Sequence, residues 1–573
     1  MSIDNLITGH IETWTTAQVP RKSGGRGRSK KSNGQYGIKK LRELILDLAV
    51  RGKLVPQDPN DEPARVLLEK IAEEKARLIE EGKSKKQKPL PEIIEDEKPF
   101  ELPPGWVWSK LGNLGETNIG LTYSPKDISD TGTPVLRSNN IQAGKLDFSN
   151  LVKVEKTIRE KALVNEGDLL ICARNGSKAL VGKTARITGL SEVMAFGAFM
   201  AILRSKANQY LLYFINSPLF RKAIDEVNTT TINQITQGNL KNTVAPIPPL
   251  TEQYRIVAKV DELMALCDQL EQEQTDNTET HQLLVKTLLD TLTNATDHAD
   301  FIESWQRIEA NFDILFTTEA SIDELKQTIL QLAVMGKLIP QDPDDEPASV
   351  LLEKIANEKA RLVKEGKIKK QKPLPEVSEE EQPFELPLGW QLIRLGEAIH
   401  LISGQHLKPA EYSETQDKEM IPYLTGPAEF GLENPCATRF TLQMRTTAEV
   451  GDILITCKGS GVGKLNIADT QIAISRQLMS MQPIVISSQY LFLMGDSLNK
   501  NIRSKIVGIA IPGISREDVL EAIIGMPPLA EQQRIVVKVN NLFKLCDSLS
   551  ERLNDTETTQ VQLADAIVGQ TIA

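Results

Sequence analysis

The segment 174–184, RNGSKALVGKT, has residue types that could bind phosphate, because its glycines expose backbone N–H groups and it ends in Gly-Lys-Thr. In nucleoside triphosphatases this ending closes the pattern G-x-x-x-x-G-K-[ST]. Here Gly176 and Gly182 enclose one residue more than that pattern allows. Residues 457–464, CKGSGVGK, repeat the loop in a shorter form, and Leu465 replaces the hydroxyl that would bind magnesium. The spacing therefore argues against a nucleotide site and leaves an ordinary glycine hairpin or a loop that contacts other phosphates.

Hydrogen bonding to base edges is a second chemistry that the polar side chains between strand-like segments could perform. Arginine suits guanine O6 and N7, and amide side chains suit adenine N6 and N7. The alternatives are an Asx-rich turn at 137–140 and a plain surface loop at 229–239. Candidate contacts in the first half of the chain are Arg137, Ser138, Asn139, Asn140, Arg174, Asn175, Ser177, Lys178, Lys183, Thr230, Asn233 and Gln234. Those in the second half are Lys458, Ser460, Lys464, Arg476, Gln477 and Arg516.

Catalytic and metal-binding patterns are hard to find. No Asn or Asp precedes a Pro-Pro-aromatic triplet, and the nearest strings, DPND (58–61) and DPDD (342–345), lack the aromatic that would hold a flipped base. We expect their Asp residues to cap a helix. Five scattered histidines and five cysteines without C-x-x-C spacing predict neither a zinc site nor disulfides, and fit a reducing cytoplasm. We predict a chain without catalytic or metal-binding residues, against two alternatives: a self-contained methyltransferase or nuclease, and a coiled-coil adaptor for proteins.

The charge is segregated along the chain. The net charge is −10 over 573 residues, which alone disfavours nucleic acid. Yet residues 106–250 hold 17 basic and 11 acidic residues, and residues 21–42 hold nine basic residues and no acidic one. Residues 390–529 hold 12 basic and 14 acidic residues, so a site there must depend on local charge or on basic partners. No apolar run approaches the ~18–20 residues of a membrane span, and we expect one surface to meet phosphates.

The sequence blocks that would form the elements positioning these residues occur twice in the chain. Residues 48–92 match residues 332–376 at 37 of 45 positions with a constant offset of 284. A second repeated block, PPLTEQYRIVAKVDELMALCDQL, begins at residue 248 and returns as PPLAEQQRIVVKVNNLFKLCDSL at residue 527. Segments of unlike sequence lie between the repeated blocks. The period is far longer than that of a solenoid, so it indicates a duplication.

The repeated blocks have helical patterns. Apolar residues step by four and three residues at Ile256, Val260, Leu263, Cys267 and Leu270, and again at Ile535, Val539, Leu542, Cys546 and Leu549, which predicts a coiled-coil seam. The cysteines in this seam are expected to be core residues. Ser321 and Glu324 predict a capping box. Pro63 and Pro347 predict the first turn of a further helix, and Gly82 and Gly366 its end.

The unlike segments, about 106–250 and 390–529, have sequence patterns typical of mixed α/β domains. Short strand-like runs at 168–173, 198–205 and 452–457 alternate with Gly, Asn and Ser turns. Both segments contain the skeleton Gly-Asp-aliphatic-Leu-Ile, at Gly167 and at Gly451, with the same offset of 284. The sequence therefore predicts one kind of helical scaffold, present in two copies, that carries two different domains.

With these features the chain resembles the specificity subunit of a Type I restriction-modification enzyme. The resemblance is carried by GTPVLRSNNIQAGKLDFSNL (132–151), GDLLICARNGSKALVGKTA (167–185) and PIPPLTEQYRIVAKVDELMALCDQLE (246–271) with its second copy at 526–549. It implies an α+β fold in which two mixed α/β target-recognition domains are separated and flanked by long antiparallel coiled-coil helices, a pseudo-twofold tandem duplication. It also implies that each domain reads one half of a split DNA sequence and that the glycine loops meet DNA phosphates.

The resemblance further implies how the chain is divided and what it binds. We expect a basic mobile tail at 1–37, outside the resemblance; helical regions with linkers at 38–105 and 251–389; target-recognition domains at 106–250 and 390–529; and a C-terminal helix at 530–573. The partners implied are double-stranded DNA, two modification subunits and the restriction subunits, without a membrane. No cofactor is expected on this chain, whereas S-adenosylmethionine, ATP and Mg are expected on the partner subunits.

The helices could set the length of the unspecified DNA between the two halves. A helix over 252–276 would be about 37 Å long. One turn of B-DNA, about 34 Å, separates two major-groove readers that face the same side. We therefore hypothesise that the helices act as a ruler.

Overall fold

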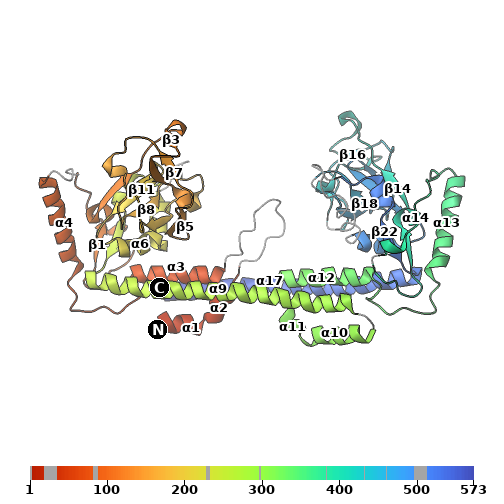
Figure 1. The fold of residues 1–573 in the computed structure, drawn as a ribbon, viewed down its shortest axis with the longest axis horizontal. Helices are drawn as coiled ribbons and strands as arrows, with labels where there is room; N and C mark the ends of the chain where they lie inside the picture. The colour runs from red at the N-terminus through yellow and green to blue at the C-terminus, as the bar shows by residue number, and fades with distance from the viewer. Residues whose placement is uncertain are drawn as a thin grey trace. The chain divides into compact units, whose positions relative to one another are not determined.

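The computed structural model describes residues 3–18, 35–81, 88–227, 233–295, 298–382, 384–431, 433–459, 461–495 and 513–572. The chain forms two compact units, one of residues 1–277 with 555–573 and one of residues 278–554. Each unit contains a β-rich domain and a group of helices (Figure 1). We call residues 107–247 the first head and residues 391–526 the second head.

The helices of the first unit share one core. They include α3 (Tyr36–Val50), the beginning of α9 (Leu250–Asn294) and the end of α17 (Leu529–Ile572). All five residues of the first expected seam, from Ile256 to Leu270, are buried in it beside Ala564 and Ile567. Polar contacts border this core: Tyr36 donates to Asp565 (2.8 Å), and Arg42 pairs with Asp268 (2.6 Å).

The second unit repeats this arrangement with the helix ends exchanged. Its core joins α12 (Glu319–Val334) to the end of α9 and the beginning of α17. Val285, Leu289 and Leu292 are buried together with Ile535 and Val539. Since each bundle contains the beginning of one long helix and the end of the other, the two helices run in opposite directions, as the resemblance implied (Figure 1).

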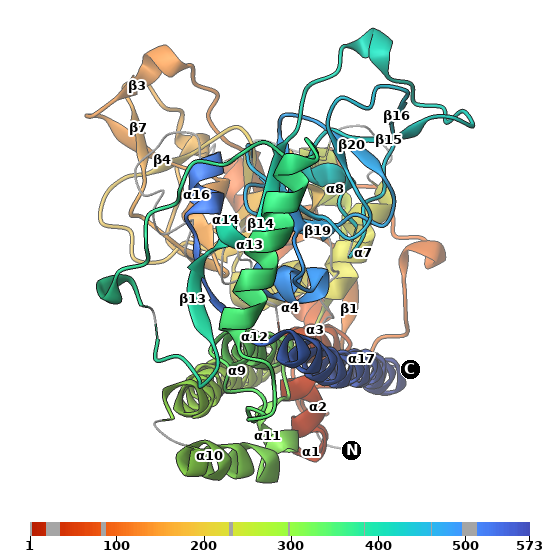
Figure 2. The ribbon, with the colours of Figure 1, turned by 90° about the vertical axis from the view of Figure 1, so that its right-hand side faces the viewer.

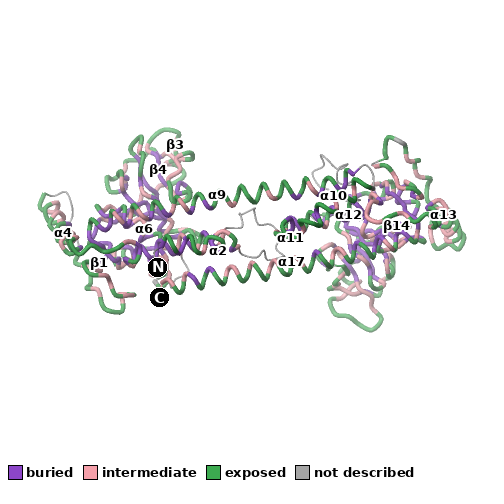
Figure 3. Tube along the Cα trace, turned by 90° about the horizontal axis from the view of Figure 1, so that it is seen from below, coloured by how far each residue is buried: buried purple, intermediate pink, exposed green. Residues whose placement is uncertain are grey.

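The helix α9 is longer than the sequence predicted. It has 45 residues, whereas the seam predicted 252–276. Residues 271–280 present mostly exposed side chains, so the apolar period disappears there (Figure 3). They contain no Gly or Pro, and Glu and Gln are good helix formers, so the helix continues without a seam.

The first head is built from two four-stranded sheets and a two-stranded ribbon. One sheet has the order β2-β11-β8-β9 and the other β10-β4-β7-β3, while β1 pairs with β12. A hairpin of β5 and β6 and the helices α5 to α8 complete the head. The strands are β1 (Val107–Lys110), β2 (Glu116–Ile119), β3 (Ile128–Ser129), β4 (Thr133–Leu136), β5 (Ile141–Gln142), β6 (Lys145–Leu146), β7 (Val152–Val154), β8 (Leu169–Cys172), β9 (Thr184–Arg186), β10 (Ala195–Phe196), β11 (Met200–Arg204) and β12 (Val244–Ile247). The helices are α5 (Leu111–Leu114), α6 (Asn208–Asn216), α7 (Pro218–Val227) and α8 (Gln237–Asn242).

The second head repeats the order of one sheet and the two-stranded ribbon despite its unlike sequence, whereas the strands of its other sheet follow a different order. Its sheets are β14-β21-β18-β19 and β16-β15-β20-β17, and β13 pairs with β22. Its strands are β13 (Gln391–Arg394), β14 (Ile399–Ser403), β15 (Ile421–Leu424), β16 (Phe440–Thr441), β17 (Thr447–Ala448), β18 (Ile453–Thr456), β19 (Leu465–Ile467), β20 (Ile472–Ile474), β21 (Leu478–Pro483) and β22 (Ile523–Met526). Its short helices include α14 (Leu395–Ala398) and α16 (Arg516–Leu520). The strands expected at 168–173, 198–205 and 452–457 are confirmed as β8, β11 and β18.

The central strand of each head is buried on both faces. In β8, Leu169 and Ile171 belong to the core shared with the helices, whereas Leu170 and Cys172 face a second core within the head. This explains why its sequence is a continuous apolar run instead of an alternating one. A strand fixed on both faces holds the loop that follows it in a defined position.

The helices α4 (Ala64–Glu80) and α13 (Ala348–Lys364) come from the near-identical block. Pro63 and Pro347 stand at their N-caps, one residue before the expected first turn, and Gly366 follows α13 with φ +71°, as a helix-ending glycine should. Gly82 lies outside the described residues. In Figure 2, α13 lies beside α14 of the second head, and Lys359 on α13 donates to Gly396 O (2.6 Å).

Two expected features are wrong. The expected mobile tail includes α1 (Ile3–Gly9) and α2 (Ile11–Thr16), with Trp14 fully buried. A Cβ on Gly37 would lie 2.3 Å from Trp14 O, so this segment packs closely on the start of α3. The basic residues 19–34 lie outside the described part. The N-cap of α12 is Thr318 instead of Ser321, because Thr318 Oγ1 accepts from Ser321 N–H (3.1 Å).

The sequence gave no signal for α10 (His298–Ala310) and α11 (Phe312–Leu315), which follow α9. Within the described part, no helix is both long and apolar enough to cross a membrane.

Candidate nucleic-acid interface

The glycine loop of the first head joins two antiparallel strands, β8 and β9. Gly182 N–H donates to Cys172 O (2.9 Å) and Cys172 N–H donates to Lys183 O (2.8 Å), so the loop closes as a hairpin. Gly182 has φ +88°, a conformation that favours glycine. A P-loop instead leads from a strand into a helix whose N-terminus faces the phosphate. The geometry therefore agrees with the sequence in excluding a nucleotide site.

The loop of the second head has the same construction. It joins β18 to the antiparallel β19, and Gly463, with φ +83°, donates to Thr456 O (2.8 Å). Lys464 follows this glycine just as Lys183 follows Gly182. The two loops are thus equivalent in backbone although they differ in length.

Two other segments of the first head contact the beginning of the loop. The N–H groups of Ala173 and Arg174 both donate to Phe199 O, at 2.9 and 3.0 Å. Ile235 N–H donates to Ala173 O (2.7 Å), and Arg174 forms a bridge with Gln234. The loop, the turn before β11 and the segment before α8 are therefore fixed to one another.

The end of β4 joins the same cluster through Asn175. Its Nδ2 donates to Ser138 Oγ (3.4 Å), and its Oδ1 accepts from Ser177 N–H (3.0 Å). Asn233 Nδ2 donates to Gly176 O (3.1 Å). The structure thus brings together about half of the polar residues that the sequence singled out in this head, namely Ser138, Arg174, Asn175, Ser177, Asn233 and Gln234.

The exposure of these side chains differs. Arg174, Asn139 and Ser177 are exposed, and Ser138, Asn175, Asn233 and Gln234 are partly buried. The guanidinium of Arg174 lies over the ring of Phe199, 5.3 Å from its centroid, and Phe199 is 59% exposed. Phe199 gave no signal in the sequence, since a lone aromatic beside a strand is usually core. We call Ser138, Arg174, Asn175, Phe199, Asn233 and Gln234 the first-head cluster.

The two lysines of the loop lie in other surroundings. Lys178 pairs with Asp225 on α7 (3.3 Å), and Arg221 of the same helix donates to Lys178 O (2.8 Å). Lys183 lines a cavity of about 810 Å³ beside α6 and α7. Lys178 is therefore partly neutralised, and Lys183 faces the helices. The sequence did not reveal either neighbour.

Asn140 is a structural residue, and its prediction as a DNA contact is wrong. It is 2% exposed, its Oδ1 accepts from Arg137 N–H (2.9 Å), and its Nδ2 donates to Asp147 O (3.0 Å) and Asn150 O (3.1 Å). Its amide is thus engaged within the turn, as in the Asx-rich alternative. Arg137 itself is half-buried, and its Nε has no partner among the described residues.

The second head places an exposed lysine where the first head has Arg174. Lys458 forms a bridge with Gly513, and Ile514 N–H donates to Cys457 O (2.9 Å). Cys457 N–H donates to Gln477 O (2.8 Å), which matches the bond from Ala173 to Phe199. Lys458, Lys464, Arg476 and Gln477 are exposed.

Arg516, a further predicted contact, is engaged within the second head. Arg516 donates to Ser403 Oγ (2.7 Å) and Leu401 O (2.9 Å), so its guanidinium joins α16 to β14. Ser460 and Thr230 lie outside the described residues. The described residues contain no group of three His, Cys, Asp or Glu side chains placed to hold a metal ion.

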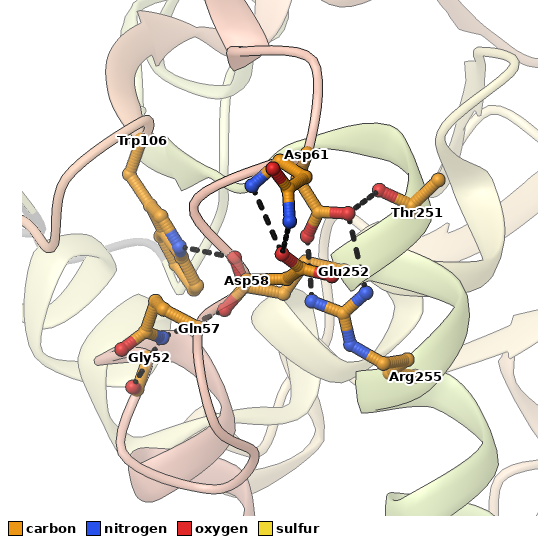
Figure 4. A network of polar contacts seen from close by, with 9 residues as sticks. Gly52, Gln57, Asp58, Asp61, Trp106, Thr251, Glu252 and Arg255 are labelled. Carbon is orange, nitrogen blue, oxygen red and sulfur yellow. Dashed lines mark hydrogen bonds and ion pairs between the residues drawn. The ribbon is translucent and has the colours of Figure 1, made fainter.

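A joint between head and helix was missed by the sequence analysis (Figure 4). Glu252, in the first turn of α9, is 1% exposed and accepts from Trp106 Nε1–H (2.9 Å) and Gln57 Nε2–H (2.8 Å). Burial raises the pKa of its carboxyl, although the two hydrogen bonds oppose this. Arg255 pairs with Asp61 (2.6 Å), so Asp61 forms an ion pair in place of the expected helix cap.

The second unit contains the same joint. Glu531 is 1% exposed and accepts from Trp390 Nε1–H (3.0 Å) and Gln341 Nε2–H (3.1 Å), and Arg534 pairs with Asp345. Burial again raises the pKa of the glutamate. The repeated elements PPLxEQ and PFELPxGW could have revealed this joint, because both recur together.

Comparisons with known proteins agree with this architecture. The family described as the Type I restriction modification DNA specificity domain matches residues 103–279 and 387–556. The Escherichia coli Type I restriction enzyme EcoEI specificity subunit is 41% identical over 604 residues, covering 99% of both chains. The EcoAI specificity subunit of the same organism is 40% identical over 597 residues, covering 100% of both. The resemblance therefore extends through the N-terminal residues that the motifs had left out.

A solved chain also shares the fold. It comes from work on complex assembly and conformational transition of the type I R-M system, with a TM-score of 0.51 and 20% identity over 83% of this chain and 99% of that one. The family match, the two relatives and the duplicated architecture lead to one conclusion. The chain belongs to the family of Type I restriction-modification specificity subunits, with two DNA specificity domains.

Proposed function

We propose that this chain selects the DNA target of a Type I restriction-modification complex, and that each head reads one half of a bipartite sequence. The observation that carries the proposal is the equivalence of the two loops. Arg174 and Lys458 occupy matching places at the end of a central strand, whereas the side chains around them differ. The same backbone with different side chains suits two domains that read different base pairs.

The proposal gives catalysis to partner subunits. Two modification subunits and the restriction subunits would bind the chain in the cytoplasm and would carry S-adenosylmethionine, ATP and Mg. The near-identity of residues 48–92 and 332–376 supports two equivalent docking regions, since two copies of one partner require two like surfaces. The free state of all five cysteines suits a reducing compartment.

The test uses the chain reconstituted with its modification subunits. Methylation mapped on a randomised DNA library should show two short specified parts around an unspecified spacer. Binding to the mapped target should weaken steeply with salt, because neutralising phosphates releases counterions.

Other outcomes support the alternatives. A single contiguous target would contradict the bipartite proposal. Methyl transfer or nicking by the purified chain alone would indicate a self-contained enzyme. A binding affinity that does not change with salt concentration would favour a protein adaptor.

A further inference from the structure

In each head, the turn before an inner strand of the sheet (β11 or β21) contacts the beginning of the glycine loop. In the first head this turn contains Phe199, whose carbonyl accepts the N–H groups of Ala173 and Arg174. In the second head it contains Gln477, whose carbonyl accepts Cys457 N–H. The backbone therefore presents residue 199 and residue 477 in matching positions, next to the cations Arg174 and Lys458.

The ring of Phe199 is placed among groups that can read bases. It is 59% exposed, and the first-head cluster around it consists of a hydroxyl, amides and a guanidinium. A single exposed apolar side chain is common on protein surfaces and means little alone. Here, however, Phe199 O accepts the N–H groups of Ala173 and Arg174, and the loop that begins with these residues is hydrogen-bonded in turn to Ser138 and to residues 233–235.

The stacked guanidinium limits what the ring can do. A wedge between two base steps needs both faces of the ring for the bases. One face of Phe199 is already covered by Arg174. The free part of the ring can still contact a methyl group, and phenylalanine meets the thymine 5-methyl group in the major groove in this way.

We propose, on the basis of the proposed function, that Phe199 reads a thymine methyl group in the first half-site and that the stacked Arg174 reads a neighbouring guanine. The arginine forms two hydrogen bonds to guanine O6 and N7, and the ring beneath it limits its rotamers. The first half-site therefore contains a thymine next to a guanine.

The second head serves as an internal contrast. Gln477 replaces the phenylalanine, and an amide suits adenine N6 and N7. Lys458 replaces the arginine and is not stacked on an aromatic ring among the described residues. The second half-site is therefore read without this apolar contact, and the two heads differ at the same place in their fold.

The experiment measures binding of the complete chain with its modification subunits to the mapped target. Each thymine of the first half-site is replaced singly by deoxyuridine, which removes only the methyl group. One position should lose about fourfold in affinity, the value expected for one buried methyl group. The variants Phe199→Ala and Phe199→Gln should bind thymine and uracil DNA equally at that position. Val193→Ala, which changes an exposed apolar residue (66%) in the segment between β9 and β10, should keep the difference.

The outcomes separate this inference from the proposed function. Specific binding to both half-sites with no thymine-to-uracil effect, or with an effect that persists in Phe199→Ala and Phe199→Gln, overturns the role of Phe199 alone. Loss of thymine discrimination in the second half-site on mutating Phe199 also overturns it. Absence of any sequence-specific binding by the complete complex overturns the proposed function instead.

Discussion

At the scale of single residues, the structure separates polar side chains that stabilise the heads from those left available to a ligand. Asn140 and Arg174 were both expected to contact DNA. Asn140 is buried with its amide engaged, whereas the guanidinium of Arg174 is exposed and touches only a ring among the contacts described. Residue type alone could not separate them, because both follow strand-like runs.

Replacing Asn140 should therefore affect folding more than recognition. Asn140→Ala leaves the N–H of Arg137 without its side-chain acceptor, and the carbonyls of Asp147 and Asn150 without their donor. An unsatisfied buried polar group costs about 1–3 kcal/mol. Thermal and urea unfolding should show this loss, while the mapped target of the folded variant stays the same. An altered target with normal stability would restore Asn140 as a reader.

Replacing Arg174 should have the opposite result. Arg174→Ala should weaken binding to the first half-site by about 1–3 kcal/mol and relax specificity there, with little change in unfolding. Lys178→Ala is the matched control from the same loop, and its effect should be smaller because Lys178 already pairs with Asp225. Titrations at several salt concentrations measure both. Equal effects of the two variants would mean that the loop contributes only general positive charge.

At the scale of elements, the repeated blocks were the part that the sequence predicted best. Their seam residues recur with a helical period, and this period reflects burial on one side of a helix. The strands at 168–173 and 452–457 could be recognised because a strand buried on both faces is a continuous apolar run. The helix end at Asn294 was not predicted, because the exposed residues 271–280 interrupt the apolar period before Val285, Leu289 and Leu292 resume it. The packed residues 3–18 form only two short helices without a sustained period.

The sequence predicted only some of the residues that form the candidate interface, because a local pattern does not show contacts with other elements. Glycine spacing and polar composition identify the loop, but not which side chains other elements neutralise. Lys178 is paired by α7, and Phe199 acquires its place only from the hydrogen bonds of its backbone. Such contacts join residues far apart in the sequence, so a local sequence pattern cannot predict them.

The joint at Glu252 gives a prediction for pH. Its folded-state pKa is raised above the ordinary value of 4.5, chiefly by burial, so the folded protein holds this proton more tightly than the unfolded chain. Its contribution to stability is complete below pH 4.5 and is lost as the pH rises through the raised value. Residue 252 cannot titrate in Glu252→Gln, so the temperature of the unfolding midpoint of this variant should fall less over that pH range. The control Glu80→Gln, which changes an exposed residue, should follow the parent protein. Identical pH profiles for Glu252→Gln and the parent would contradict the joint's role.

At the scale of the whole molecule, one duplicated mounting carries two diverged heads, and α9 and α17 each extend through both units. The ruler hypothesis predicts that the DNA spacer follows helix length. Removing one heptad from each helix, at 271–277 and 553–559, should shorten the spacer by about three base pairs, since seven residues span ~10 Å. These positions leave the described seam residues in place. Methylation mapping that finds an unchanged spacer in a folded, active complex would refute the ruler.

The claim that each head reads its own half-site can be tested most directly by exchanging one head. Residues 107–250 are replaced by the corresponding segment of a relative with a different target, and the joint residues Trp106 and Glu252 are kept. Methylation by the reconstituted complex should then change in one half of the target only, while the other half stays that of the parent chain. A change in both halves, or in neither, would contradict the account.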